Sequence, residues 1–192
     1  MLNGLVLIGG KSSRMGTDKY KLPFHGKAQY QHLAELISQL GIAVHISSSQ
    51  QQIGDISGEF NVIPDEYHAI GPMGGILSAM KYLPHSPWLV IACDLPFVTT
   101  KTIESLVSKR NSEADVTTFQ LNERFFETTF AIYEPSSYRW VEQFRLQENY
   151  RLQAAFKTMK LHVLQPENHR DFMNINTTTD LEKFKKIKAS EK

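Results

Sequence analysis

The segment WLVIACD, residues 88–94, is apolar from Trp88 to Ala92 and becomes acidic at Asp94. An unbroken apolar run of this length is typical of a strand that is buried on both faces of a parallel sheet. A second apolar run, GLVLI at residues 4–8, has the same character. We therefore expect a sheet with residues 88–94 as its central strand and residues 4–8 as another buried strand.

Short apolar runs alternate with segments of helical periodicity along the rest of the chain, which is typical of parallel strands joined by crossover helices. Further strands are expected at residues 43–47, 60–65, 114–120, 128–134 and 161–166. Helices are expected at residues 30–40, 76–83, 100–107, 135–146 and 178–188. The sequence thus predicts an α/β protein with three α/β/α layers and a mainly parallel central sheet, in a single domain over residues 1–192.

The composition is that of an ordinary globular protein, with 41% hydrophobic residues, 21% charged residues and a formal net charge of +1. This balance indicates no bulk attraction to nucleic acid or to a membrane surface. The single cysteine, Cys93, excludes an internal disulfide, and the seven histidines have no zinc-ligand spacing. The early apolar run from Leu5 to Ile8 is too short for a signal peptide or a membrane span. We expect a cytoplasmic protein.

The loop after the first strand, LIGGKSSRMGTDK at residues 7–19, carries two adjacent glycines and three cations. It lacks the GxGxxG pattern of a dinucleotide-binding loop. The GKS at residues 10–12 is reminiscent of a P-loop, but the first glycine of that motif would fall on Leu5. Both of these phosphate-binding motifs are therefore excluded.

A different kind of phosphate site remains open for this loop. Gly9 and Gly10 allow the backbone to approach a ligand closely, and Lys11, Arg14 and Lys19 can converge on negative charge. A polyphosphate fits such a loop. The alternative is a solvated turn between a strand and a helix, in which the charges only contact water.

Two aspartates follow predicted strands, Asp65 after residues 60–64 and Asp94 after residues 88–93. Ligands of open α/β sheets bind outside the carboxyl ends of the strands, so both carboxylates are expected at the same edge as the glycine loop. A carboxylate in that place suits Mg²⁺, which proteins hold with one or two carboxylates plus substrate phosphates. Asp94 could instead cap a turn, since Pro96 follows it.

Four segments together resemble the molybdenum cofactor guanylyltransferase family, in the same order and at similar separations: LIGGKSSRMGTDKYKLPFHGK, IPDEYHAIGPMGGI, ACDLPF and MNINTTTDL. The resemblance covers nearly the whole chain and implies a Rossmann-like nucleotidyltransferase domain. It also implies transfer of GMP from GTP to the terminal phosphate of molybdopterin, with Mg²⁺ as cofactor and pyrophosphate as product. The adjacent glycines Gly9 and Gly10 match the guanylyl branch of this superfamily rather than the cytidylyl branch.

The resemblance assigns site residues to three roles. Nucleotide-binding residues would be Leu7, Gly9, Gly10, Lys19, Asp65 and Asp94. Catalytic residues would be Arg14, Lys19 and Asp94, with Asp94 as the metal ligand. Acceptor-side residues would be Gly71, Pro72, Gly75, Asn174 and Asn176. Transient contact with other molybdenum cofactor proteins is also implied.

The chain departs from the family pattern at three places. One is the segment QENYRLQAAF, which lacks the glycine that is expected before Arg151. Serines at 47–49 stand where relatives tend to carry an asparagine, and Glu127 and Thr128 stand where a histidine-proline or glutamine-proline pair is common. These departures keep two other functions open. One is nucleotidyl transfer to another acceptor, either a sugar phosphate or a cytidylyl acceptor, and the other is a nucleotide-binding module without catalysis.

Overall fold

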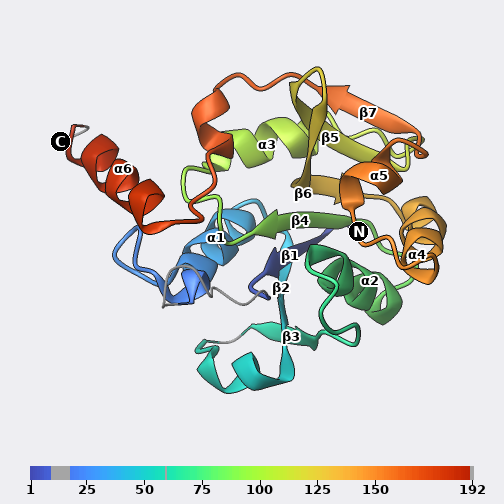
Figure 1. Ribbon diagram of the computed structural model, residues 1–192, viewed down its shortest axis with the longest axis horizontal. Coiled ribbons are helices and arrows are strands. Elements are labelled where there is room, and N and C mark those ends of the chain that lie inside the picture. The colour runs from blue at the N-terminus through green and yellow to red at the C-terminus, as the bar shows by residue number, and fades with distance from the viewer. Residues whose placement is uncertain (10–17, 59, 191–192) are drawn as a thin grey trace.

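Within residues 1–9, 18–58 and 60–190, which the computed structural model describes, the chain builds one seven-stranded sheet (Figure 1). The strand order is β3-β2-β1-β4-β6-β5-β7. The strands are β1 (Asn3–Leu7), β2 (Ala43–Ser48), β3 (Asn61–Pro64), β4 (Trp88–Ala92), β5 (Val116–Asn122), β6 (Phe125–Tyr133) and β7 (Leu161–Leu164). Strands were expected in all seven of these places, and all seven expectations are confirmed.

The sheet is parallel except at β6. Strand β1 pairs in parallel with β2 and β4, β2 pairs in parallel with β3, and β5 pairs in parallel with β7. Strand β6 runs antiparallel to both β4 and β5. The predicted mainly parallel sheet is confirmed. Because β6 is reversed, its first residues lie at the edge where the parallel strands end.

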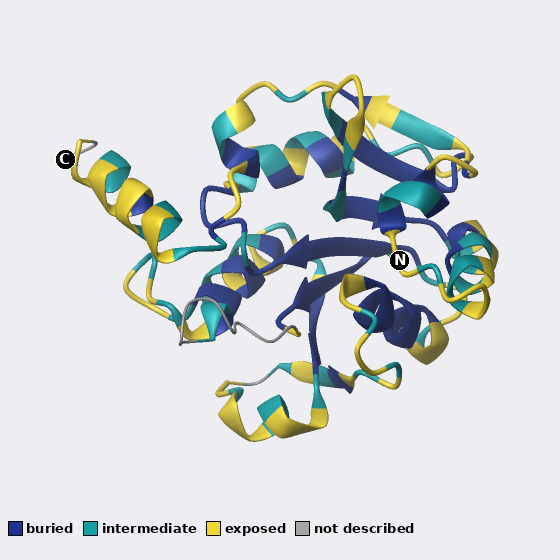
Figure 2. Ribbon diagram, viewed as in Figure 1, coloured by how far each residue is buried: buried dark blue, intermediate teal, exposed yellow. Residues whose placement is uncertain are grey.

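Helices cover both faces of the sheet, which confirms the predicted three layers (Figure 1). The helices α1 (Gln29–Ser38) and α3 (Thr100–Ser108) pack into one core cluster, and α2 (Pro72–Tyr82), α4 (Tyr138–Leu146) and α5 (Leu152–Phe156) pack into the other. Short 3₁₀ turns are η1 (Lys19–Lys21), η2 (Gln50–Asp55), η3 (Pro135–Ser137) and η4 (His169–Phe172). In Figure 2 the central strands β1 and β4 are buried between these layers, whereas the edge strands β3 and β7 are partly exposed.

Strand β4 shows why its sequence is apolar at every position. Trp88 and Val90 point into the core cluster beneath α2, whereas Leu89 and Ile91 point into the cluster beneath α1 and α3. All four side chains have 0% exposure. A strand covered on both faces has no solvated side on which a polar residue would be favourable.

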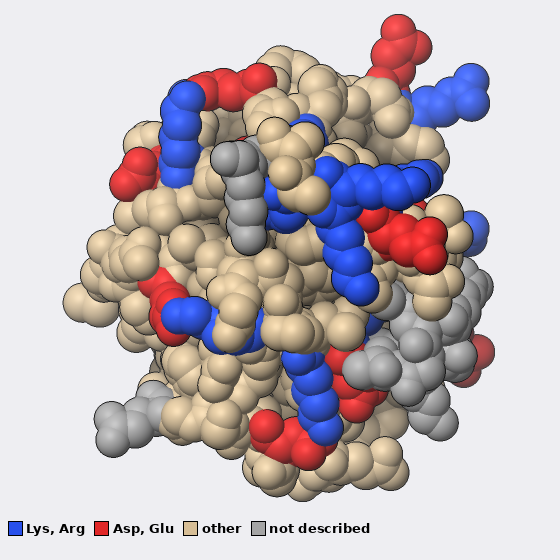
Figure 3. Space-filling model, turned by 90° about the vertical axis from the view of Figure 1, so that its left-hand side faces the viewer, with Lys and Arg blue, Asp and Glu red and all other residues tan. Residues whose placement is uncertain are grey.

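The last helix, α6 (Thr178–Ala189), extends from the body of the molecule at the left of Figure 1. Its N-cap, Thr177, accepts a hydrogen bond from Asp180 N, and Phe184 packs with Phe97 and Ile175 in a small third cluster. On the face that Figure 3 shows, basic and acidic side chains are interspersed. In the part of the chain that is described, no helix has the length and apolar character needed to cross a membrane.

Several elements differ from the sequence expectation. The expected helix at residues 135–146 is divided into η3 and α4, and neither η2 nor α5 was predicted. With five residues, α5 is too short to display a helical period, and burial of Leu152, Ala155 and Phe156 stabilises it. Tertiary packing, which a local pattern does not encode, decides such short elements.

Candidate active site

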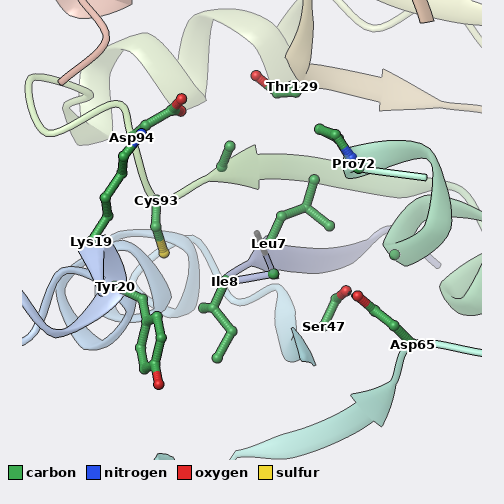
Figure 4. A pocket seen from close by; sticks show the side chains of 14 residues that line it. Leu7, Ile8, Lys19, Tyr20, Ser47, Asp65, Pro72, Cys93, Asp94 and Thr129 are labelled. Carbon is green, nitrogen blue, oxygen red and sulfur yellow. Dashed lines mark hydrogen bonds between the residues drawn. The ribbon is translucent and has the colours of Figure 1, made fainter. Parts of the chain in front are cut away.

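A pocket lies where strands β1, β2 and β4 end, and it is lined by residues from segments far apart in the sequence (Figure 4). The structure brings together these residues that the sequence proposed: Leu7, Gly9, Lys19, Asp65, Gly71, Pro72, Gly75 and Asp94. The pocket also contains Ser47 and Thr129, which the sequence did not single out as site residues. Gly10, Lys11 and Arg14 lie outside the described residues.

Lys19 is held at the pocket by the short turn η1. The next residue, Tyr20, is only 2% exposed, packs edge-on against Tyr30, and donates a hydrogen bond from its hydroxyl to Asp55 at 2.8 Å. Lys21 forms an ion pair with the same carboxylate at 2.8 Å. These contacts anchor the backbone on the C-terminal side of Lys19, so its side chain starts from a defined position.

The two asparagines near the carboxyl end of the chain have different surroundings. Asn176 accepts a hydrogen bond from Lys19 Nζ, and the neighbouring Ile175 donates its N–H to the carbonyl of Asp94 at 2.8 Å. The segment before α6 is therefore tied directly to the end of β4. Asn174 is exposed and is not among the residues that line the pocket.

Asp94 follows β4 at the edge of the sheet. Its Oδ1 is buried and has no hydrogen-bond partner within the described ranges. Burial raises the pKa of the Asp94 carboxyl, and the nearby charge of Lys19 acts in the opposite direction. Although no cluster of three or more histidine, cysteine, aspartate or glutamate residues is present in the described part, a single carboxylate suffices for a cation that substrate phosphates also bind.

Asp65 is fixed by its neighbours on β2 and α2. Ser47 is 1% exposed and donates its hydroxyl to Asp65 Oδ1 at 2.5 Å, and the two side chains face each other in Figure 4. A side chain at Gly75 would collide with Ser47 Oγ, so glycine permits this arrangement. The other carboxylate oxygen, Oδ2, lies 3.0 Å from the position that a Cβ of Gly9 would take. Asp65 therefore faces the glycine loop.

Burial raises the pKa of Asp65, whereas the hydrogen bond from Ser47 and the charge of His68 lower it.

The amino end of α2 also faces the pocket. Gly71 has φ 65°, a left-handed conformation that glycine adopts without strain, and Pro72 follows it at the start of the helix. The first N–H groups of a helix have no partner within the helix, and its dipole favours negative charge there. A phosphate group of a ligand would be stabilised at this end of α2.

Glu127 does not extend into the pocket. Its side chain is 6% exposed and turns back along β6, where Oε1 accepts hydrogen bonds from Thr129 N and Thr129 Oγ1, each at 2.8 Å. Thr129 itself lines the pocket. Glu127 therefore meets the pocket only through its hydrogen bonds to Thr129.

The comparisons with known proteins follow this geometry. Residues 4–163 match the family described as the MobA-like NTP transferase domain. The chain belongs to this family. Membership in a nucleotidyltransferase family suggests the use of a divalent metal. This is compatible with the carboxylate oxygen of Asp94 that has no hydrogen-bond partner among the described residues.

Two curated relatives of this MobA-like domain are informative. A molybdenum cofactor biosynthesis bifunctional protein of Synechocystis sp. is 30% identical over 184 residues, which is 93% of this chain and 52% of that protein. The chain thus spans about half of that bifunctional protein. A probable molybdenum cofactor guanylyltransferase of Natranaerobius thermophilus is 26% identical over 195 residues, which is 96% of this chain and 95% of that protein.

A solved structure confirms the fold of the MobA-like domain. The crystal structure of molybdopterin-guanine dinucleotide biosynthesis protein A from Archaeoglobus fulgidus aligns with a TM-score of 0.83 at 22% identity. The alignment covers 99% of this chain and 100% of that one.

The pocket of this MobA-like transferase has chemically distinct sides. Gly9, Asp65 and Ser47 belong to the side formed by β1, β2 and β3. Asp94, which follows β4, and Thr129, which lies within β6, form the other side. Lys19 and the amino end of α2 supply positive potential between carboxylates. Such an arrangement can bind a polyphosphate together with a cation and still leave room for chemistry at a phosphorus atom.

Of the two pocket residues Ser47 and Thr129, only Ser47 has a signal in the sequence. Ser47 follows the apolar run of β2 just as Asp65 and Asp94 follow theirs, which is a signal for a residue at the ligand edge. Thr129 carries no such signal, because it lies in the middle of a strand and reaches the same edge only because β6 is reversed and extends past the end of β4.

Proposed function

We propose that the protein is a molybdenum cofactor guanylyltransferase, which transfers GMP from GTP to the terminal phosphate of molybdopterin and releases pyrophosphate. The observation that carries this proposal is the convergence of Lys19, Asp65 and Asp94, from three distant segments, on one pocket beside the amino end of α2. The name of the Natranaerobius relative, which aligns over nearly its full length, supports the same reaction.

In this reaction an oxygen of the terminal phosphate of molybdopterin attacks the α-phosphorus of GTP. The bond between that phosphorus and the bridging oxygen of pyrophosphate breaks, and the electron pair leaves with pyrophosphate. A phosphate monoester is already anionic at neutral pH, so no side chain has to remove a proton. The protein's task is to bring two polyanions together and to stabilise the charge that develops on the leaving group.

The described residues suit that task. We assign Lys19 to the phosphates as a compact positive charge, together with Arg14, whose guanidinium can bind two phosphate oxygens at once. The N–H groups at the amino end of α2 would add further stabilisation of negative charge. Leu7, Gly9, Gly10 and Asp65 are assigned to the nucleotide, and Gly71, Pro72, Gly75, Asn174 and Asn176 to the acceptor side.

Mg²⁺ is the divalent metal that we assign to Asp94. The hard oxygen Oδ1 of Asp94, which has no other described partner, fits a cation that binds few protein carboxylates and retains water and phosphate ligands. When bound, Mg²⁺ would neutralise phosphate charge and polarise the α-phosphoryl group.

Transfer to a different acceptor is the second candidate. The departures from the family pattern support it: Ser47, which donates its hydroxyl to Asp65, and Glu127 both stand where relatives tend to carry other residues. In this alternative the nucleotide side of the pocket keeps its role, and only the acceptor changes.

Pyrophosphate release from GTP, CTP, ATP and UTP in the presence of Mg²⁺, each with and without molybdopterin, tests the proposal. We expect release only with GTP and only when molybdopterin is present. Tight GTP binding without turnover would contradict the proposal and favour either another acceptor or a binding module. Pyrophosphate release with CTP instead of GTP would indicate that the protein transfers CMP and belongs to the cytidylyl branch.

The proposal includes a cytoplasmic location and small-molecule substrates, GTP and molybdopterin, without nucleic acid or membrane partners. The single cysteine, which is buried, is compatible with a reducing compartment. Other molybdenum cofactor proteins would meet the enzyme only in transient contacts.

A further inference from the structure

The middle of β6, at Thr129, forms a part of the pocket wall that the reaction described above does not use. Because β6 runs antiparallel to β4, with Phe130 paired with Ile91, the residues just before Phe130 lie beside the end of β4. Thr129 lines the pocket there, and Figure 4 shows it on the same side as Asp94 and across from Asp65. This is the side opposite to the one assigned to the nucleotide.

The hydroxyl of Thr129 has a defined direction. Glu127 Oε1 accepts both the backbone N–H and the hydroxyl of Thr129, each at 2.8 Å. Glu127 is itself held, because its carbonyl accepts a hydrogen bond from Thr118 Oγ1 at 2.6 Å and its side chain is 6% exposed. A threonine hydroxyl has one proton and two lone pairs. Once the proton is donated to Glu127, Thr129 Oγ1 can offer a ligand only lone pairs.

The charge around this hydroxyl leads to the same preference. Burial raises the pKa of Glu127 and the hydrogen bonds from Thr129 lower it, while the charge of Asp94 raises it, so the two carboxyl groups influence each other. A site with acidic neighbours and an oxygen that only accepts hydrogen bonds disfavours phosphate and favours an N–H group. The phosphate of the acceptor would instead lie toward Lys19 and the amino end of α2.

We propose that Thr129 is a specificity-determining residue that accepts a hydrogen bond from an N–H group of the acceptor molecule, and that Glu127 is the positioning residue that orients it. For molybdopterin the matching group is the amino edge of the pterin ring. This inference rests on the proposed function and extends it, since it states how the enzyme selects the organic part of the acceptor. It also gives the departure at Glu127 a role: the carboxylate acts on the ligand through Thr129.

The test separates the two substrates in steady-state kinetics of pyrophosphate release. Thr129→Val removes the hydroxyl and keeps both the shape of the side chain and the backbone hydrogen bond to Glu127. We expect its KM for molybdopterin to rise roughly three- to tenfold, as for loss of one hydrogen bond, while its KM for GTP stays within about twofold of the parent. Thr129→Ser, which keeps the hydroxyl, should behave like the parent.

Variants of Glu127 test the positioning role. Glu127→Gln still offers an oxygen to the N–H and hydroxyl of Thr129 and should stay near the parent. Glu127→Met, of similar volume but without an acceptor, should show the same selective rise in KM for molybdopterin as Thr129→Val. The double variant Glu127→Met with Thr129→Val should have the same KM for molybdopterin as Thr129→Val alone. Both variants lack the same hydrogen bond to the acceptor, so the two effects should not add.

Other results would overturn the inference. These are an unchanged KM for molybdopterin in Thr129→Val, an equal rise in both KM values, or a loss in Glu127→Gln as large as that in Glu127→Met. Thermal unfolding of each variant shows whether it is folded, and Thr129→Val keeps the test decisive if Glu127→Met does not fold. If the parent protein releases no pyrophosphate, the proposed function and this inference are both overturned. If the parent is active and Thr129→Val has the same KM for molybdopterin as the parent, only the inference is overturned.

Discussion

Lys19 carries the clearest prediction at the scale of single residues. It reaches the pocket from η1, and Asn176 accepts a hydrogen bond from its Nζ. In Lys19→Ala the charge that faces the phosphates is lost, so we expect turnover to fall well over tenfold, on the order of a hundredfold. Steady-state pyrophosphate release measures this.

Lys27→Ala is the matched control for Lys19. Lys27 forms an exposed ion pair with Glu35 at 2.7 Å and does not line the pocket. Exposed pairs contribute little to stability, so this variant should keep its activity. Near-normal turnover in Lys19→Ala would contradict the assignment of this residue.

Asp94 carries the second prediction at this scale. Asp94→Asn keeps the shape of the side chain but removes the negative charge that would hold Mg²⁺. We expect the dependence of turnover on Mg²⁺ concentration to be abolished, together with most of the activity. A metal titration of the rate in parent and variant measures this. An exposed carboxylate variant, Glu123→Gln, serves as the control, and a metal response of Asp94→Asn equal to that of the parent would mean that Asp94 is structural.

At the scale of elements, the close approach of α2 to β1 and β2 packs Gly75, which is assigned to the acceptor side, against Leu7 and Asp65 of the nucleotide side. A Cβ at Gly75 would lie 2.8 Å from Leu7 Cδ2 and 3.3 Å from Asp65 Oδ1, in addition to its collision with Ser47 Oγ. We therefore expect Gly75→Ala to push α2 away from the strands, to weaken GTP binding and to lower the free energy of unfolding by about 1–3 kcal/mol. Calorimetric titration with GTP and chemical denaturation measure the two effects.

Gly54→Ala is the control for this substitution. Gly54 lies in η2, and a Cβ there would meet no atom within 4 Å. The control should retain both GTP binding and stability. A Gly75→Ala variant with the same GTP affinity as the control would show that the contact between α2 and the strands does not shape the site.

At the scale of the whole molecule, two stacked histidines connect α1 with the segment before it and with α6. The rings of His25 and His32 are stacked with centroids 3.8 Å apart, His25 Nε2 lies 2.7 Å from the carbonyl oxygen of Pro96, and His25 meets Phe184 of α6 edge-on. The pKa of His32 is lowered from 6.5 to about 4, mainly by burial and also by the charge of His25. Lys27 and Lys188 act in the same direction, and Glu35 opposes them.

This arrangement predicts a dependence of stability on pH. The pKa of His32 is lower in the folded chain than in the unfolded chain, so the unfolded chain binds more protons between about pH 6.5 and about pH 4. The free energy of unfolding should therefore fall as the pH decreases through this window. Chemical denaturation at several pH values measures the slope, and His32→Gln should flatten it. An identical slope in parent and His32→Gln would contradict this account.

The parts of the fold that depend on local patterns could be predicted from the sequence. Three features are recognisable from a few neighbouring residues alone. They are the apolar run from Trp88 to Ala92, the helix cap at Thr99, and Gly41, the left-handed glycine after α1. For the same reason the glycine loop and the aspartates Asp65 and Asp94 could be expected at one edge, because parallel strands end together.

By itself, then, the sequence determined the α/β class, the mainly parallel sheet and the family to which the chain belongs, because apolar periodicity and short motifs are local properties. The tertiary structure alone decided that β6 runs in reverse and that Ser47 holds Asp65 beneath Gly75. The physical reason is that strand order and the direction of a buried carboxylate depend on packing between residues far apart in the chain. No segment of the sequence contains both partners of those contacts.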